Sequence, residues 1–252
     1  MRFVRRALLA VLILGMPASP ALAAGKMIKI ASGSEKIDAY LAEPTREPTG
    51  NLVVVHEWWG LNDWVKRTAD RFAAQGFRVL APDLYRGKVA TTSELAHELM
   101  RGLPEERAAA DVQAAAAYLR PSSSGPTLRN AVIGFCMGGR IALVASLENS
   151  PFEATVVCYG APVLSPTRLS RMRGPLLGIY GELDQGIPPD QVKKFGSLAR
   201  GAQKNARMLE YPGVGHAFLN DTNKGYDAIT AHKAWTDIDA FLAHNLAKPN
   251  DR

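Results

Sequence analysis

Short apolar runs alternate with amphipathic segments along most of this chain. From residue 52 onward, each compact apolar run is followed by a segment whose apolar residues recur every three or four positions. The first kind of pattern indicates a buried strand and the second indicates a helix. Strand character is found at 27–30, 37–42, 52–56, 77–81, 130–135, 154–158, 175–180 and 206–211.

The segments between these runs carry the signals of helices. Segment 63–75 places Trp64 and Phe72 on one apolar face and ends before Gly76, which is a common residue just past a helix. Further helices are predicted at 104–119, 140–147, 188–199 and 226–246.

The strand pattern predicts the fold class. Runs 52–55 and 132–133 are apolar without alternation, as expected for strands that helices cover on both faces. We therefore predict an α/β fold, with a mostly parallel central sheet of about eight strands and helices on both faces. The first two runs precede the alternation, and we expect them to form an antiparallel hairpin at the edge. Because no period of 20 to 50 residues repeats, residues 24–252 are expected to form one domain.

Residues 1–23 have the pattern of a signal peptide. A basic start containing Arg2, Arg5 and Arg6 is followed by a short uncharged apolar stretch and a small-residue cleavage site after Ala23. The apolar stretch is too short to span a bilayer. We expect a periplasmic or secreted protein without membrane contact after cleavage, and the Sec and twin-arginine export routes both stay open.

The charge of the chain argues against a nucleic-acid partner. The net charge is +6, and half of it comes from the three arginines of the predicted signal peptide, which contains no acidic residue. No cluster of Lys and Arg interleaved with aromatic residues follows. We expect a monomer that acts on a small molecule.

Segment 134–139, with the sequence GFCMGG, predicts a nucleophile. It joins a predicted buried strand to a predicted helix, and small residues flank its central Cys136. This is the context of the G-x-S-x-G elbow, with cysteine in the place of serine. The helix N-terminus favours the thiolate, the form that attacks. The alternative, in which Cys136 is only a small buried apolar residue, is less consistent with the glycine pattern.

Cys158 raises the question of a disulfide, because an exported protein meets an oxidising environment. A bond to Cys136 would remove the proposed nucleophile. We therefore do not expect these two thiols to pair.

An acid and a histidine follow the elbow in the chain order of α/β-hydrolases. Asp184 comes after the run 175–180, and His216 comes after the run 206–211. Both lie just past predicted strand ends, where open α/β sheets place their sites. His216 is expected to exchange protons with Cys136, and Asp184 is expected to orient the imidazole. Glu182 is a competing acid two residues away.

Five motifs together resemble the dienelactone hydrolases, which are α/β-hydrolases with a cysteine nucleophile. They are HEWWG at 56–60, APDLY at 81–85, GFCMGG at 134–139, GELDQGIP at 181–188 and GHAF at 215–218. The resemblance implies an α/β-hydrolase fold, a triad of Cys136, Asp184 and His216 and an ester or lactone substrate. It implies no cofactor and no metal.

The resemblance also implies further site residues. The carboxylate matching Glu57 holds the thiol at rest and takes its proton when substrate binds, and the backbone N–H groups of Met137 and Trp58 form the oxyanion hole. Independently of the family, a glutamate directly after the buried run 52–55 is expected to be partly buried, which raises its pKa toward that of a useful proton acceptor.

The substrate is less clearly predicted than the reaction. Trp59 and Tyr85 are candidates to line the acyl pocket. The family binds its substrate carboxylate with two arginines, and Asn220 stands at the position of one of them. Arg86 and Lys88 are candidates to supply that charge from another direction. Without a bidentate arginine clamp, selection for an anionic substrate should weaken.

We therefore predict a dienelactone hydrolase-like carboxylic ester hydrolase. A broader carboxylesterase or thioesterase acting on neutral acyl groups is the first alternative, and it is favoured by Asn220. A periplasmic thiol redox or binding protein is the second, although a C-x-x-C motif is missing. A catalytically idle binding scaffold is the third.

Overall fold

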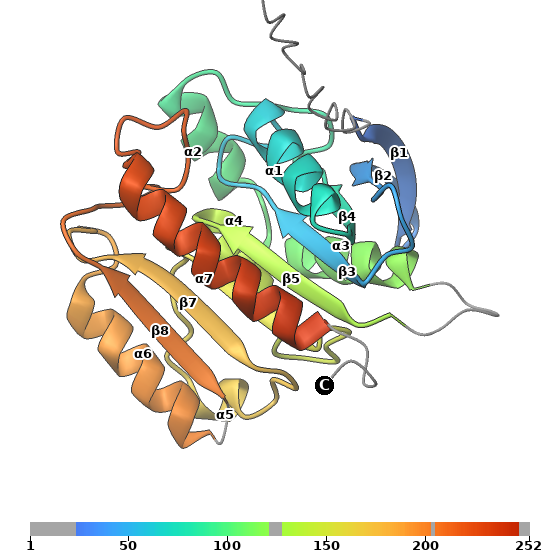
Figure 1. The fold of residues 1–252 in the computed structure, drawn as a ribbon. Helices are drawn as coiled ribbons and strands as arrows, with labels where there is room; N and C mark the ends of the chain where they lie inside the picture. The colour runs from blue at the N-terminus through green and yellow to red at the C-terminus, as the bar shows by residue number, and fades with distance from the viewer. Residues whose placement is uncertain (1–23, 121–127, 203–204, 247–252) are drawn as a thin grey trace, which may run out of the picture.

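The computed structural model describes residues 24–120, 128–202 and 205–246, and the signal peptide predicted at residues 1–23 lies outside them. The described residues form one eight-stranded sheet (Figure 1). Its strands are β1 (Lys26–Ser32), β2 (Glu35–Ala42), β3 (Gly50–Val55), β4 (Phe77–Pro82), β5 (Asn130–Phe135), β6 (Ala154–Cys158), β7 (Leu176–Gly181) and β8 (Ala206–Tyr211).

The strands lie in the order β1-β2-β4-β3-β5-β6-β7-β8. β1 pairs with β2 and β2 with β4 in antiparallel fashion, and every pair from β4 to β8 is parallel. The predicted α/β fold with a mostly parallel sheet of about eight strands is confirmed, as is the antiparallel hairpin at its edge.

Helices cover both faces of the sheet (Figure 1). One apolar cluster joins α1 (Asp63–Ala74) and α7 (Ala228–Leu246) to Leu52 and Val54 of β3. The other joins α3 (Glu105–Leu119), α4 (Met137–Ala145) and α6 (Pro189–Gly201) to Val53 and Val55. Successive residues of β3 therefore enter opposite cores, which explains why this strand is apolar without alternation.

Two short helices were not predicted. They are α2 (Ser93–Arg101) and α5 (Pro166–Leu169). The sequence of α2 carries a short apolar stripe of Leu95, Ala96, Leu99 and Met100, of which only Ala96 is fully buried. Its first turn is capped by Thr92, whose hydroxyl accepts from the N–H of Leu95. None of the helices among the described residues is long and apolar enough to cross a membrane.

The parallel register brings the carboxyl ends of six strands, β3 to β8, to one edge of the sheet. Phe135 at the end of β5 pairs with Cys158 of β6, and Gly181 at the end of β7 pairs with Tyr211 of β8. The residues that follow these strands therefore meet at this edge, as ligand sites of open α/β sheets do.

Candidate active site

The chain turns sharply at Cys136, between β5 and α4. Cys136 has φ +53° and ψ −118°, a conformation that non-glycine residues rarely adopt. Its N–H donates to the carbonyl of Cys158 at 3.0 Å, and its own carbonyl accepts from the N–H of Gly139 at 3.0 Å. The surrounding backbone thus holds this strained residue at the N-terminus of α4.

Two glycines of the predicted elbow permit this turn. A Cβ atom at Gly134 would overlap the carbonyl oxygen of Gly138, and a Cβ atom at Gly138 would overlap the carbonyl oxygens of Val55 and His56. The first turn of α4 therefore packs directly against the ends of β5 and β3, where no side chain fits.

His216 is held by Asp184. Nδ1 of His216 lies 2.7 Å from Oδ2 of Asp184, whose other oxygen accepts from the N–H groups of Gly186 and Ile187 at 2.9 and 3.2 Å. Glu182, the competing acid, instead accepts from the N–H of Gly213 at 3.1 Å. Of the two acids in this loop, Asp184 is therefore the one that pairs with the histidine.

The electrostatics of this pair follow from its contacts. Burial alone would lower the pKa of His216, but its hydrogen bond to Asp184, its interaction with the Cys136 sulfur and the charges of both raise it to about 10. Burial would raise the pKa of Asp184, but the hydrogen bond and charge of His216 and the two backbone N–H groups lower it. The structure thus favours a protonated imidazole between a carboxylate and a sulfur.

Glu57 follows β3 and is almost fully buried, with 2% of its surface exposed. Its Oε1 accepts from the hydroxyl of Tyr159 at 3.1 Å, and its Oε2 accepts from Nδ2 of Asn220 at 2.7 Å. Burial raises the pKa of Glu57, while the hydrogen bonds from Asn220 and Tyr159 and the charge of His216 oppose this rise. Burial thus acts on this pKa in the direction expected from the sequence.

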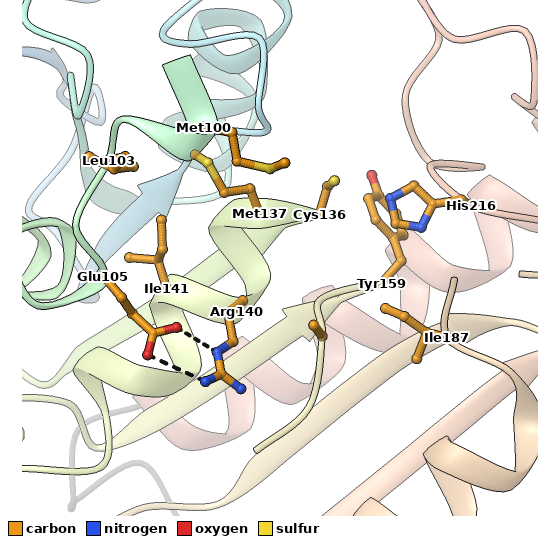
Figure 2. Close-up of a pocket in the computed structure, with 11 residues that line it drawn as sticks. Met100, Leu103, Glu105, Cys136, Met137, Arg140, Ile141, Tyr159, Ile187 and His216 are labelled. Carbon is orange, nitrogen blue, oxygen red and sulfur yellow. Dashed lines mark hydrogen bonds and ion pairs between the residues drawn. The ribbon is translucent and has the colours of Figure 1, made fainter. Parts of the chain in front are cut away.

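Two cavities meet at the sulfur. The first, of about 410 Å³, lies between α4 and the segment joining α2 to α3, and the second, of about 650 Å³, lies beside the loops after β3 and β7. Cys136, His216 and Met100 line both. Figure 2 shows the first cavity, with Cys136 and His216 on the same side of the view. A substrate carbonyl next to the sulfur can therefore extend one group into each cavity.

Known proteins match this chain over nearly the whole described fold. The model of the dienelactone hydrolase family matches residues 37–246. This chain belongs to the dienelactone hydrolase family. It is a hydrolase of the type that acts on lactone and ester bonds.

Relatives within the dienelactone hydrolase family support the same assignment. The chain is 32% identical to the "Putative carboxymethylenebutenolidase" of Methylorubrum extorquens over 236 residues, covering 87% of this chain and 81% of that protein. A crystal structure titled "Putative Dienelactone Hydrolase", from Klebsiella pneumoniae, has a TM-score of 0.79 and 28% identity, covering 87% of this chain and 98% of that one. The dienelactone hydrolase of Anabaena variabilis, at 19% identity and a TM-score of 0.67, shares the fold over 88% of this chain and 98% of its own.

In this member of the dienelactone hydrolase family, the residues predicted for the oxyanion hole and the substrate pocket lie in different parts of the site. Trp58 and Trp59 line the second cavity, and Met137 lines the first. The Tyr85 hydroxyl donates to the sulfur of Met137 at 3.2 Å, and neither cavity is lined by Tyr85. Asn220 is buried and donates a hydrogen bond to Glu57, so its contact with the site is indirect, through the Glu57 carboxylate.

Arg86 lies outside both cavities. Its guanidinium pairs with Asp111 at 2.7 Å and with Glu35 at 3.0 Å. The structure therefore does not bring Arg86 together with Cys136.

Several residues of the site carried no recognisable signal in the sequence. Tyr159 follows β6 directly, binds Glu57, and packs edge-on against the ring of His216 with centroids 5.1 Å apart. His97 and Met100 come from the unpredicted helix α2. Within the described part of the chain, no group of three or more His, Cys, Asp or Glu side chains is placed to hold a metal ion.

Proposed function

We propose that this family member cleaves a carboxylic ester or lactone through a thioester on Cys136. The observation that carries the proposal is the Asp184–His216 hydrogen bond of 2.7 Å, beside a cysteine in elbow geometry that lines the same cavities as the histidine. A nucleophile, a proton carrier and an orienting acid are then all present in the order of the hydrolases.

The steps follow from the charge state of His216. With a pKa raised to about 10 by its neighbours, the imidazole holds a proton at neutral pH, so it serves as the acid of the first step while another group takes the proton of the Cys136 thiol. Sγ of Cys136 attacks the carbonyl carbon, and the imidazolium gives its proton to the departing alkoxide, which leaves a thioester. Neutral His216 then takes a proton from water, whose oxygen attacks the thioester carbon and displaces the thiolate. The products are an alcohol and a carboxylic acid, or one hydroxy acid from a lactone.

The oxyanion formed in each attack requires hydrogen-bond donors. We assign this role to the backbone N–H groups of Met137 and Trp58. Met137 is the first residue of α4, so its N–H has no acceptor within the helix, and the helix dipole favours negative charge at this end. Trp58 follows Glu57 at the adjoining strand end and lines the second cavity. Donors fixed in this way stabilise the developing charge without reorganisation.

Glu57 is assigned the role of a proton acceptor for the resting thiol. The support is its burial beside the site and the direction in which burial moves its pKa. The two donors, Tyr159 and Asn220, orient both carboxylate oxygens. The test compares the alkylation rate of Cys136 with and without a bound substrate analogue that leaves the thiol accessible; equal rates would contradict the role.

The substrate is a small molecule, and we propose that the protein meets it after export, in the periplasm or outside the cell. The support for export is the pattern of residues 1–23. A fusion of residues 1–23 to a reporter enzyme tests this, and retention of the reporter in the cytoplasm would contradict it.

The decisive experiment for the chemistry replaces each cysteine separately. Cys136→Ala should abolish hydrolysis of p-nitrophenyl butyrate, whereas the matched control Cys158→Ala, at a fully buried position, should stay active. Mass spectrometry of the rapidly quenched wild type should find the acyl group on the peptide that contains Cys136. Full activity of Cys136→Ala would overturn the proposal.

A further inference from the structure

The first cavity contains an arginine whose charge is already neutralised. Arg140 is the only Lys or Arg among the residues that line it. Its Nε lies 2.7 Å from Oε2 of Glu105, its Nη2 lies 3.3 Å from Oε1, and its Nη1 donates to the carbonyl of Pro162 at 2.9 Å. Figure 2 shows Glu105 and Arg140 directed toward each other across the cavity wall. The edge of the Arg140 guanidinium that would bind a substrate carboxylate is therefore already occupied by the carboxylate of Glu105.

Arg140 lies close to the reacting atom along the helix. It is one turn after Cys136, whose carbonyl accepts from the Arg140 N–H at 3.3 Å. Four residues correspond to about 6 Å of rise along a helix axis. A substrate group of a few carbons that runs from the attacked carbonyl into this cavity therefore passes the Glu105–Arg140 pair.

Both cavities are lined mostly by apolar side chains, and the Glu105–Arg140 pair distinguishes the first from the second. Apart from the Glu105–Arg140 pair and the residues of the triad, the first is lined largely by apolar side chains, namely those of Met100, Leu103, Met137, Ile141, Ala161 and Ile187. The second includes exposed residues of the loop after β7, among them Leu183 and Gln185, through which an alcohol can leave to solvent. We therefore place the acyl group in the first cavity, beside the Glu105–Arg140 pair, and the leaving group in the second, beside the exposed loop after β7.

We propose that Glu105 determines acyl specificity by neutralising Arg140, so that this enzyme selects neutral apolar acyl groups and rejects acyl groups that end in a carboxylate. This inference rests on the proposed function and names its substrate class. An anionic acyl group would have to displace Glu105 from Arg140 or lie beside an unpaired carboxylate. A neutral chain instead gains from burial against the apolar wall.

The test measures kcat/KM for ethyl esters of neutral acids (butyrate, valerate, hexanoate) and for the monoethyl esters of succinate, glutarate and adipate, which match them in carbon number. In the wild type, kcat/KM should rise about three- to fourfold per added CH₂ of the neutral series. Each anionic ester should be at least about tenfold poorer than its neutral match, as expected for the loss of a charge-assisted hydrogen bond.

Variants then test whether Glu105 and Arg140 determine the acyl specificity. Glu105→Gln should free Arg140 and raise the anionic-to-neutral ratio of kcat/KM about tenfold or more, and the double variant Glu105→Gln/Arg140→Met should lose that gain. Glu106→Gln, at the neighbouring exposed position outside this cavity, should leave the ratio unchanged. Arg140→Met alone leaves Glu105 unpaired and should lower the ratio, so the charge argument is tested even if Glu105→Gln does not fold.

Three results would overturn the inference. They are a wild type that hydrolyses the anionic esters as well as the neutral ones, an unchanged ratio in folded Glu105→Gln, and a chain-length dependence that follows the alcohol and not the acyl group. Failure of the proposed function is distinguishable, since in that case Cys136→Ala would still hydrolyse the neutral esters.

Discussion

Asp184 and His216 come from different strand ends and are joined by a hydrogen bond of 2.7 Å between Oδ2 and Nδ1. The carboxylate is itself held by the backbone N–H groups of Gly186 and Ile187. This arrangement leaves Nε2 of the imidazole free for the site where Cys136 lies. Asp184 thus acts on the Cys136 thiol only through His216, and removal of its carboxylate should change the properties of the histidine.

Replacing Asp184 by Asn should lower kcat for ester hydrolysis by about 10²-fold or more, which is less than the loss of about 10⁴ in a serine triad. The loss should be smaller because Glu57, and not His216, takes the proton of the thiol before the first attack. The measurement is steady-state kinetics with p-nitrophenyl butyrate. Glu182→Gln is the matched control, since Glu182 binds the N–H of Gly213 and not His216; a larger loss in the control would contradict the assignment of Asp184.

The pH dependence should report the raised pKa of His216. Because the protonated imidazole donates to the leaving group, kcat/KM should fall as pH rises through about 10. In Asp184→Asn this basic limb should move to lower pH. For stability the sign is the same: a pKa raised from 6.5 to about 10 contributes stability that is present below pH 6.5 and lost as pH rises toward 10. A basic limb at the same pH in both proteins would contradict the coupling.

Replacing Glu57 by Gln should lower kcat/KM by about 10²-fold while stabilising the fold at neutral pH. Burial raises the pKa of Glu57 in the folded state, so ionisation destabilises the protein as pH rises above 4.5. The amide keeps a hydrogen bond to each neighbour: its oxygen accepts from Nδ2 of Asn220, and its nitrogen donates to the hydroxyl oxygen of Tyr159. Thermal unfolding at pH 7 and pH 4 measures the effect; the gain in Tm should shrink at the lower pH, and a loss of Tm at pH 7 would oppose this account.

Gly134→Ala should destabilise the protein by about 1–3 kcal/mol or prevent folding, because its Cβ would overlap the carbonyl of Gly138 in the first turn of α4. Gly201→Ala is the matched control. It lies at the end of α6 and its added Cβ would meet no atom within 4 Å. Urea denaturation should find a loss of free energy of unfolding only for the first variant. Equal stability of the two would show that the elbow can relax.

Arg86→Met should act mainly on stability. Its pair with Asp111 involves a carboxylate whose side chain is only 2% exposed, and removing the guanidinium leaves that charge buried with a single remaining donor, the hydroxyl of Ser32. The expected cost is about 3 kcal/mol, measured by urea denaturation. A selective rise of KM for anionic esters, with no loss of stability, would instead support Arg86 as a substrate-binding residue.

The strands of the sheet could be predicted well from the sequence. The inner strands β3, β5, β6 and β7 are buried throughout and mostly apolar, whereas the edge strands β1 and β8 mix polar with apolar residues, and both patterns are local information. Helix α2 was missed although Leu95, Ala96, Leu99 and Met100 are spaced as in an amphipathic helix, because this stripe is short. The start of α4 was placed three residues late, since Gly138 and Gly139 weaken the helical pattern although the helix begins at Met137.

The candidate site was only partly predictable. Cys136, Asp184 and His216 could be named because each follows a strand in a recognisable motif. The partners of Glu57 could not, because Tyr159 and Asn220 lie 102 and 163 residues away in sequence, and only the sheet register brings them together. In the same way, nothing in the local sequence of Arg140 shows that Glu105 neutralises it across two helices.

Residues 158–160, at the end of β6 and directly after it, contact both the turn at Cys136 and the carboxylate of Glu57. Cys158 accepts the N–H of Cys136, Tyr159 donates to Glu57, and Gly160 packs so closely on Gly139 that a Cβ there would collide. Anyone redesigning this enzyme for another ester should therefore keep Tyr159 and Gly160, whereas Cys158 contributes through its backbone carbonyl and not through its side chain. Sequence diversity is better introduced in α2 and at position 105, where the wall of the cavity can be remodelled without disturbing the chemistry.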